Sequence, residues 1–378
     1  MKALIERPDL PLRPPAAGAL LFRTICLASL LALAACGSDD DDTTAAPEGQ
    51  AGEPGEQGSD AGAPPDGLRL LSSGGGRSVE EAIGEVEAAI AGNGAVSVVR
   101  IIDHAAGAES IGETLPPTSV ILFGNPALGT PLMERSRTAG LDLPQKILAY
   151  QDADGELEIA WNTSDWLAAR HGIDPATPEL ATIADALEGL AMRAAGTSSG
   201  ETDGAAQEGA DADEGGADAG APDEAGADGA VADGADAAPM VAPGEGIVTV
   251  TSANDFETTY AALVAAIQAD GPPDLLVELD HAANAASVGL ELPPTRLVVF
   301  GNPALGTPLM QSARSVAIDL PQRMLVREGE DGAVSIAYND PAWVAGRHGI
   351  TDRSEQVETI TGALAALAAG AAAEGGGN

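Results

Sequence analysis

Histidine and aspartate are the side chains of this sequence best suited to chemistry. All four histidines fall into two pairs, and the second pair repeats the first after 177 positions. An aspartate precedes the first histidine of each pair. Two imidazoles and a carboxylate suit zinc or another divalent metal, and an Asp–His unit suits proton transfer by a general base. The candidate metal ligands are Asp103, His104, His171, Asp280, His281 and His348.

A structural interpretation of the same histidines is equally open. His104 follows a predicted strand and can hydrogen-bond a loop. His171 precedes Gly172 at a predicted helix end, where a histidine interacts favourably with the helix dipole. The spacing in sequence does not fix the distance between the histidines. Ligand, metal, catalytic and structural roles therefore stand as alternatives.

A second candidate site is the segment Gly124-Asn-Pro-Ala-Leu-Gly-Thr130, which returns as residues 301–307. A strand that runs through glycine-rich backbone into a helix start can present free N–H groups to an anion. The segment lacks the lysine of a P-loop, so a tight turn with proline at the first helical position is the alternative. The candidate ligand-binding residues are His104, His171, Asn125, Thr130, His281, His348, Asn302 and Thr307.

Two further features recur in both copies. Asp142-Leu-Pro144 predicts a turn in which the aspartate accepts backbone N–H groups and the Leu–Pro bond is cis. Arg137 and Arg170 also have counterparts, and we expect internal ion pairs with Asp142 rather than contacts with a ligand. Trp166 and Trp343 lie at apolar helical spacing and are predicted core residues.

The elements that position these residues are predicted twice, because the chain contains an internal repeat. The repeat runs without a gap over Asp103–Ile173 and again over Asp280–Ile350. Apolar periodicity and capping residues predict α+β domains, two copies of a two-layer α/β fold with a small, mostly four-stranded sheet packed by helices. In the first copy we expect helices near 78–91, 105–114, 126–137, 164–171 and 178–194, and strands near 96–102, 119–123, 146–150 and 156–161.

The N-terminal segment has the pattern of a lipoprotein signal. Basic residues precede an apolar run over 25–35, which is too short to span a bilayer and ends at Leu33-Ala-Ala-Cys36. This end resembles a bacterial lipobox, in which cleavage precedes Cys36 and several acyl chains then anchor the cysteine stably. Gly37 resembles the residue that follows the cysteine in lipoproteins sorted to an outer membrane. We expect a cell-envelope protein anchored to the membrane through Cys36 and facing the periplasm.

Charge and cysteine positions separate the remaining chain into acidic segments and two domains. The formal net charge of −40 is concentrated in acidic segments, which argues against nucleic acid as a partner because phosphate binding needs clustered Lys and Arg. Cys26 and Cys36 both precede the repeats, so no disulfide can form inside either one. We expect a signal peptide over 1–35, an acidic tether over 36–66, domain one over 67–195, an acidic linker over 196–245, domain two over 246–369 and a tail over 370–378.

The recurring motifs resemble a known family, the bacterial and archaeal domain of unknown function 302. This resemblance implies a compact two-layer α/β domain, dimerisation of single-domain members and no established catalytic activity. The motifs that carry it are Asp280-His-Ala-Ala-Asn-Ala285, Leu292-Pro-Pro-Thr-Arg-Leu-Val-Val-Phe-Gly-Asn-Pro303, Gly306-Thr-Pro-Leu-Met310, Leu320-Pro321 and Tyr338-Asn-Asp-Pro341.

The first copy departs from these motifs at Gly107, where the second has Asn284, and at Thr163-Ser164. If Asn284 contributes to a site, the first copy is expected to be the weaker one. We expect a lipid-anchored protein whose repeats pack as a pseudo-dimer and bind a small ligand or a metal. The alternatives are a scaffold lipoprotein without a ligand and, less favoured, an enzyme with an Asp–His base. The sequence indicates no particular cofactor.

Overall fold

The structure is a computed structural model that describes residues 65–73, 76–197, 241–269 and 271–375. Residues Ser59–Asn378 group into one compact unit, which contains both repeats. The predicted signal peptide, the predicted lipidation site Cys36 and most of the predicted linker lie outside the described residues. In the described part, no helix is long and apolar enough to cross a bilayer.

The first repeat contains a five-stranded antiparallel sheet in the order β1-β5-β4-β3-β2. Its strands are β1 (Leu68–Ser73), β2 (Ser97–Asp103), β3 (Thr118–Gly124), β4 (Gln145–Gln151) and β5 (Leu157–Asn162). Its helices are α1 (Val79–Ala91), α2 (His104–Ser110), α3 (Pro126–Arg135), α4 (Ser164–His171) and α5 (Pro178–Ala195), with a 3-10 helix η1 (Arg137–Leu141) before β4.

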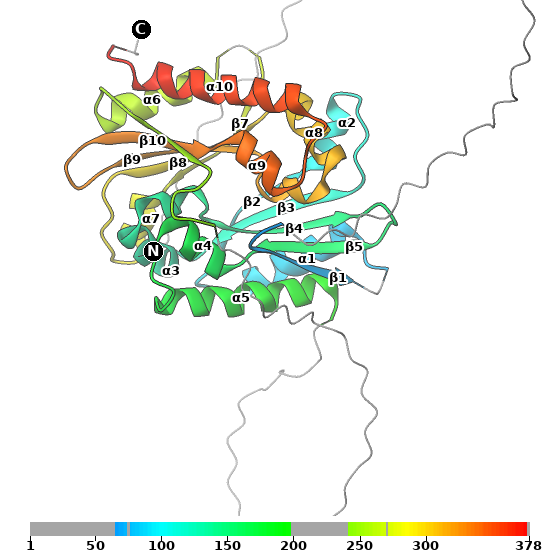
Figure 1. Cartoon of the computed structure of the whole chain (residues 1–378). Helices are drawn as coiled ribbons and strands as arrows, with labels where there is room; N and C mark the ends of the chain where they lie inside the picture. Colours follow the sequence, from blue (N-terminus) through cyan, green and yellow to red (C-terminus); the bar gives the residue numbers. More distant parts are fainter. Residues whose placement is uncertain (1–64, 74–75, 198–240, 270, 376–378) are drawn as a thin grey trace, which may run out of the picture. The chain divides into compact units, whose positions relative to one another are not determined.

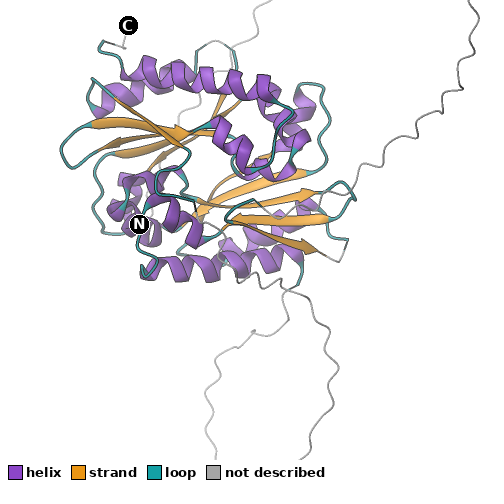
Figure 2. Ribbon diagram, in the orientation of Figure 1, coloured by secondary structure: helices purple, strands orange, loops and turns teal. Residues whose placement is uncertain are grey.

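The second repeat has the same order of elements, and its sheet runs β6-β10-β9-β8-β7 (Figures 1 and 2). Its strands are β6 (Ile247–Thr251), β7 (Asp274–Asp280), β8 (Thr295–Gly301), β9 (Gln322–Glu328) and β10 (Val334–Asn339). Its helices are α6 (Phe256–Ile267), α7 (His281–Ser287), α8 (Pro303–Ser312), α9 (Pro341–Arg347) and α10 (Ser354–Ala372), with a 3-10 helix η2 (Arg314–Ile318) before β9.

Local side-chain caps explain where several helices begin and end. Ser78 caps the start of α1, and Glu81 completes a capping box with it. Asn125 accepts a hydrogen bond from the N–H of Ala127 and so caps α3. Gly172 ends α4 with a φ of 63°, a left-handed conformation that glycine adopts without strain. The predicted C-cap is confirmed, whereas the N-cap of α4 is Thr163 and not Ser164.

Each sheet has five strands where the sequence predicts four. The additional strands are β1, which pairs with β5 so that Leu68 lies opposite Asn162, and β6, which pairs with β10. Both are short edge strands whose partners lie far along the chain, so no local pattern marks them as paired. The α+β architecture itself is as predicted, two layers in each repeat.

Both faces of each sheet are buried. In the first sheet, Ile121 and Phe123 pack in a core with α1 and α5. Their neighbours Val120 and Leu122 point to the opposite face and share a core with Val316 of η2. The second sheet repeats this arrangement, with its own helices α6 and α10 on one face and η1 of the first repeat on the other. The two 3-10 helices therefore lie at the centre of the contact between the repeats.

Candidate functional site

Asp142 is the centre of a buried ionic cluster in the first repeat. Arg170 Nη1 donates to Asp142 Oδ2 at 2.5 Å, and His171 Nε2 lies 2.9 Å from the same oxygen. His171 Nδ1 lies 2.9 Å from Thr138 Oγ1 in η1. Burial raises the pKa of Asp142, but Arg170 and His171 outweigh it and hold the pKa well below its usual range. The expected ion pair of Arg170 is confirmed, and these side chains replace the backbone N–H donors expected for Asp142.

The second repeat contains the same cluster around Asp319. Arg347 Nη1 donates to Asp319 Oδ2 at 2.7 Å, and His348 Nε2 lies 2.9 Å from this oxygen. His348 Nδ1 lies 2.9 Å from Ser315 Oγ in η2. In both repeats the histidine at the end of α4 or α9 thus has partners on both ring nitrogens. Neither ring offers a free nitrogen to a ligand.

Two asparagines join the clusters across the repeats. Arg170 Nη2 donates to Asn339 Oδ1 at 2.8 Å, and Arg347 Nη2 donates to Asn162 Oδ1 at 2.8 Å. Each arginine thereby binds the aspartate of its own repeat and the asparagine of the other. Hydrogen bonds to charged groups that are removed from water are stronger than neutral ones, so the two arginine–asparagine bonds stabilise the contact between the repeats.

Two tryptophans lie against the same arginines. The guanidinium carbon of Arg347 is 4.3 Å from the ring centroid of Trp166, and that of Arg170 is 4.5 Å from the centroid of Trp343. Each pair joins one repeat to the other. Trp166 is buried as predicted, whereas Trp343 is only partly buried. The stacking adds a cation–π attraction to the packing of each ring.

Lys146 and Arg323 occupy equivalent positions beside the two clusters, and both are buried. Lys146 Nζ and Arg323 Nη2 each lie 3.8 Å from Asp319 Oδ1. Burial and then the charge of Arg323 lower the pKa of Lys146 to about 7, against the opposing effect of Asp319. The first repeat therefore places a group that titrates near neutral pH where the second has a permanently charged arginine.

The predicted metal group does not assemble. Among the residues that the structure describes, no group of three or more His, Cys, Asp or Glu is placed to hold a metal ion. Asp103 instead caps α2 through the N–H of Ala106, and Asp280 caps α7 in the same way. His171 binds side chains of η1 and the adjoining turn, whereas His104 lies near the carbonyl of Ala317 in η2.

His104 and His281 begin α2 and α7 and face the 3-10 helix of the opposite repeat. His281 Nε2 lies 3.1 Å from the carbonyl oxygen of Gly140. A Cβ at Gly140 would lie 3.4 Å from His281 Cδ2, so the glycine permits this close approach. The equivalent residue in η2 is Ala317, and His104 Nε2 forms no hydrogen bond with any described residue. Burial lowers the pKa of both histidines to about 4, so both are neutral at pH 7.

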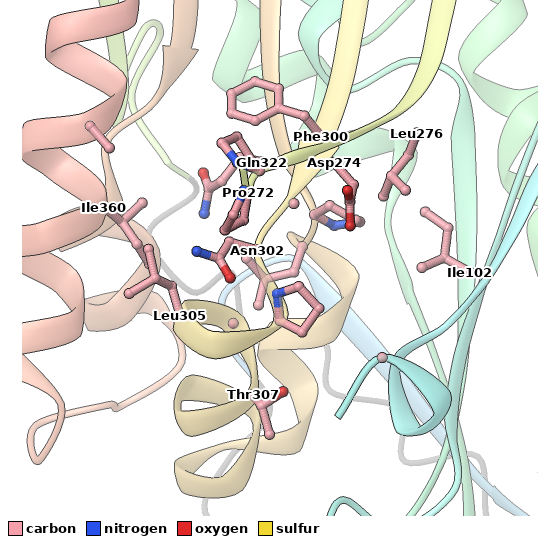
Figure 3. Close-up of a pocket in the computed structure, with 18 of the residues that line it drawn as sticks. Ile102, Pro272, Asp274, Leu276, Phe300, Asn302, Leu305, Thr307, Gln322 and Ile360 are labelled. Carbon is pink, nitrogen blue, oxygen red and sulfur yellow. The ribbon is translucent and has the colours of Figure 1, made fainter. Parts of the chain in front are cut away.

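A pocket of about 620 Å³ lies between α2 of the first repeat and helices α6, α8 and α10 of the second. Three predicted ligand-binding residues from the two repeats line it, namely His104, Asn302 and Thr307. Most of its wall is apolar, and Figure 3 shows Ile360 of α10 and Ile102 of β2 on opposite sides of it. Apolar walls with a few convergent polar groups are typical of sites that bind small organic molecules.

Several polar groups in this pocket have hydrogen-bonding capacity to spare. Asn302 Oδ1 accepts from the N–H of Ala304, while its amide nitrogen forms no hydrogen bond with the described residues. The amides of Asn302 and Gln322 both project toward α10 (Figure 3). Thr307 is buried, and its Oγ1 has no partner among the described residues. Leaving a buried hydroxyl unpaired costs about 1–3 kcal/mol, which a suitable ligand would offset.

The charges of the pocket do not suit an anion. Asp103 and Asp274 line it, and the described lining residues include no Lys or Arg. The turn before α8 also holds its own N–H groups, because Asn302 caps the helix and its carbonyl accepts from Leu305 and Gly306. The anion site expected for the Gly-Asn-Pro segment is therefore not supported here.

The equivalent residues of the first repeat belong to α3 and its N-cap, and α3 contacts α7. Asn125 caps α3, and Thr130 is buried with an unpartnered Oγ1 among the described residues. Sequence reasoning did not assign a role to Gln322, to Lys146 or to the two bridging asparagines. Recurrence in both copies marks Gln322 and the asparagines, but only the fold shows which of them faces a pocket and which a partner arginine.

The comparisons with known proteins identify a family. The model of "Domain of unknown function DUF302" matches residues 72–190 and 248–367, more than half of the chain. A structure of a DUF302 protein from Bacillus stearothermophilus is similar at 19% identity and a TM-score of 0.30, covering 33% of this chain and 96% of that one.

Curated relatives from Brucella match part of the chain. A protein of Brucella suis named "Fluoride-specific ion channel FluC 1" is 40% identical over 129 residues, which cover 33% of this chain and 50% of that protein. A protein of the same name from Brucella abortus is 40% identical, with 47% of its length covered. The chain thus spans about half the length of the curated relatives it matches.

Proposed function

This chain belongs to the DUF302 family, whose activity is unknown, and we propose from its own site that it binds a small, mainly apolar molecule in the pocket between the repeats. The observation that carries the proposal is the convergence of His104, Asn302 and Thr307 on one pocket. These residues come from both repeats, and Thr307 is a buried polar group without a partner among the described residues.

The walls define the chemical class of the ligand. Most of the surface would contact an aliphatic or aromatic body, and the amides of Asn302 and Gln322 suit a hydrogen-bonding end group. Asp103 and Asp274 repel an anion, and His104 is neutral at pH 7 because burial lowers its pKa to about 4. The ligand is therefore uncharged or cationic. The names of the Brucella relatives suggest fluoride, but this acidic pocket does not favour it.

Two dyes with the same aromatic skeleton test this proposal. N-phenylnaphthylamine is uncharged, and anilinonaphthalenesulfonate adds a sulfonate to it. We expect the uncharged dye to bind the mature protein at least about tenfold more tightly, a difference of about 1.4 kcal/mol. Fluorescence titration at constant ionic strength measures both affinities.

A matched pair of variants locates the dye. Leu367 lies on α10 in the pocket wall, and Leu190 is its counterpart on α5 in the first repeat. Leu367→Trp should fill the pocket and remove binding of the uncharged dye, whereas Leu190→Trp should leave it. Equal loss in both variants, or a preference for the sulfonate, would contradict the proposal. No binding of either dye would favour the scaffold alternative.

We further propose that the protein is anchored in the cell envelope by acyl chains on Cys36. The support is the lipobox-like Leu33-Ala-Ala-Cys36 at the end of an apolar run. In a bacterial host, Cys36→Ser should abolish incorporation of labelled palmitate and move the protein from the membrane to the soluble periplasmic fraction. Retention of the variant in membranes would refute the anchor.

A further inference from the structure

Helices α2 and α7 occupy equivalent places in the two repeats, but they carry different residues at one position. Gly107 lies on α2 and lines the pocket. Asn284 takes the equivalent position on α7, the helix that contacts α3. A Cβ built at Gly107 would lie 3.8 Å from Cγ of Pro303, the first residue of α8. A longer side chain at position 107 would therefore extend beside the start of α8, where Asn302 and the ligand space lie.

We propose that Gly107 is the residue that keeps this pocket open, and that Asn284 narrows its counterpart between α7 and α3. The chain then binds one ligand rather than two, although each fold unit is present twice. This inference rests on the proposed ligand-binding function. It identifies Gly107 as the residue that determines which of the two equivalent sites binds the ligand. It reverses the expectation that the copy lacking the asparagine is the weaker one.

The histidines that begin these two helices also differ, in their hydrogen bonds. His281 on α7 is bound to the carbonyl of Gly140, so its ring is engaged in the contact between the repeats. His104 on α2 lines the pocket, and its Nε2 has no hydrogen-bond partner among the described residues. Helix α2 therefore combines Gly107 with an imidazole that borders the pocket and lies near the carbonyl of Ala317. Helix α7 carries Asn284 at that position and a histidine bound to the carbonyl of Gly140.

Reciprocal exchange of the two residues tests the inference on the full mature chain. The readout is the affinity and the number of N-phenylnaphthylamine molecules bound per chain, taken from fluorescence and calorimetric titrations. Wild-type protein should bind one molecule. Gly107→Asn should weaken binding at least about tenfold. Asn284→Gly should retain the first site and create a second, so that the number bound rises toward two.

A third variant separates the pocket from the stability of α2. Ala106→Asn adds the same side chain at an exposed position of α2 that does not line the pocket, so it should bind the dye like wild type. Melting temperatures should show that all three variants fold. Two dye molecules on wild type, or unchanged binding by Gly107→Asn, would overturn the inference while the proposed function stands. No dye on wild type would overturn the proposed function and this inference with it.

Discussion

Single residues set the charge at the contact between the repeats. The negative charges of Asp142 and Asp319 each balance an arginine, and the histidine beside each carboxylate contacts the same oxygen as the arginine. Lys146 adds a positive charge whose nitrogen has no hydrogen bond to the described residues. Burying such a charge is unfavourable, and the lowered pKa of Lys146 expresses this cost.

The paired arginines are expected to dominate stability at this scale. Arg347→Ala would leave Asp319 buried without its closest partner, at a cost of about 3–5 kcal/mol in the free energy of unfolding. Arg135→Ala is the matched control, because Arg135 is exposed and 4.0 Å from Glu179; it should cost less than about 1 kcal/mol. Urea denaturation measures both, and equal effects would argue against a stabilising role for the buried cluster.

The pKa of Lys146 predicts a pH dependence. The folded-state pKa of about 7 lies below the ordinary value of 10.5, so the unfolded state binds more protons between these pH values. The free energy of unfolding should therefore rise as pH increases through this window, and the cost of the charged lysine should be fully present below pH 7.

Two substitutions at equivalent positions isolate this effect. Lys146→Met should remove the rise in stability across the window. Arg323→Met should reduce the rise without removing it, because Lys146 stays buried but loses the neighbouring charge that also lowers its pKa. Chemical denaturation at several pH values provides the comparison. A wild-type slope that persists in Lys146→Met would show that another group is responsible.

At the scale of elements, the 3-10 helices η1 and η2 connect each repeat to the sheet of the other. Leu141 of η1 packs in a buried cluster with Leu297 and Leu325 of the second sheet, and Val316 of η2 packs on the first sheet. These short helices follow α3 and α8 in the chain. Sequence patterns did not predict them because they are too short for a helical periodicity.

Gly140 provides a test of how closely η1 must approach the second repeat. A Cβ there would lie 3.1 Å from Leu325 Cδ1 and 3.2 Å from Met133 Sδ, in addition to its contact with His281. Gly140→Ala should destabilise the protein by about 1–3 kcal/mol through overpacking. The control Gly84→Ala on α1 has nothing within 4 Å and should stabilise by about 0.5–1 kcal/mol. Thermal unfolding that ranks the two in the opposite order would contradict this account.

At the scale of the whole molecule, the contact between the repeats combines shared apolar cores, bridging arginines and stacked tryptophans. Single-domain members of the family are expected to use an equivalent contact between two chains, which the internal repeat here replaces by one between covalently joined domains. We expect such a contact to persist when the chain is cut between the repeats.

Cleavage between the repeats is the corresponding test. A protease site placed within residues 198–240 allows the chain to be cut after folding. We expect the two halves to elute together in size-exclusion chromatography at micromolar concentration. The double variant Arg170→Ala/Arg347→Ala should separate after the same cut, because its bridging bonds are lost. Separation of the cut wild-type halves would exclude the pseudo-dimer.

The sequence by itself determined the elements that depend on near neighbours. Ser78 and Gly172 mark helix ends because a cap bonds groups only a few residues away. The apolar run of β3 predicts a strand buried on both faces, since Val120 and Ile121 point to opposite sides. The repeat, the family and the ion pair of Arg170 with Asp142 were also readable, because recurrence in two copies marks them.

Only the tertiary structure decided which of the recurring residues meet. β1 lies beside β5, His281 reaches Gly140, and Asn339 binds Arg170, each across a long stretch of chain. Such contacts depend on how two folded repeats fit together, and no local periodicity encodes that fit. The pocket has the same origin, since its wall joins Gly107 of one repeat to Asn302 of the other. Equivalent residues of the two repeats therefore have different neighbours.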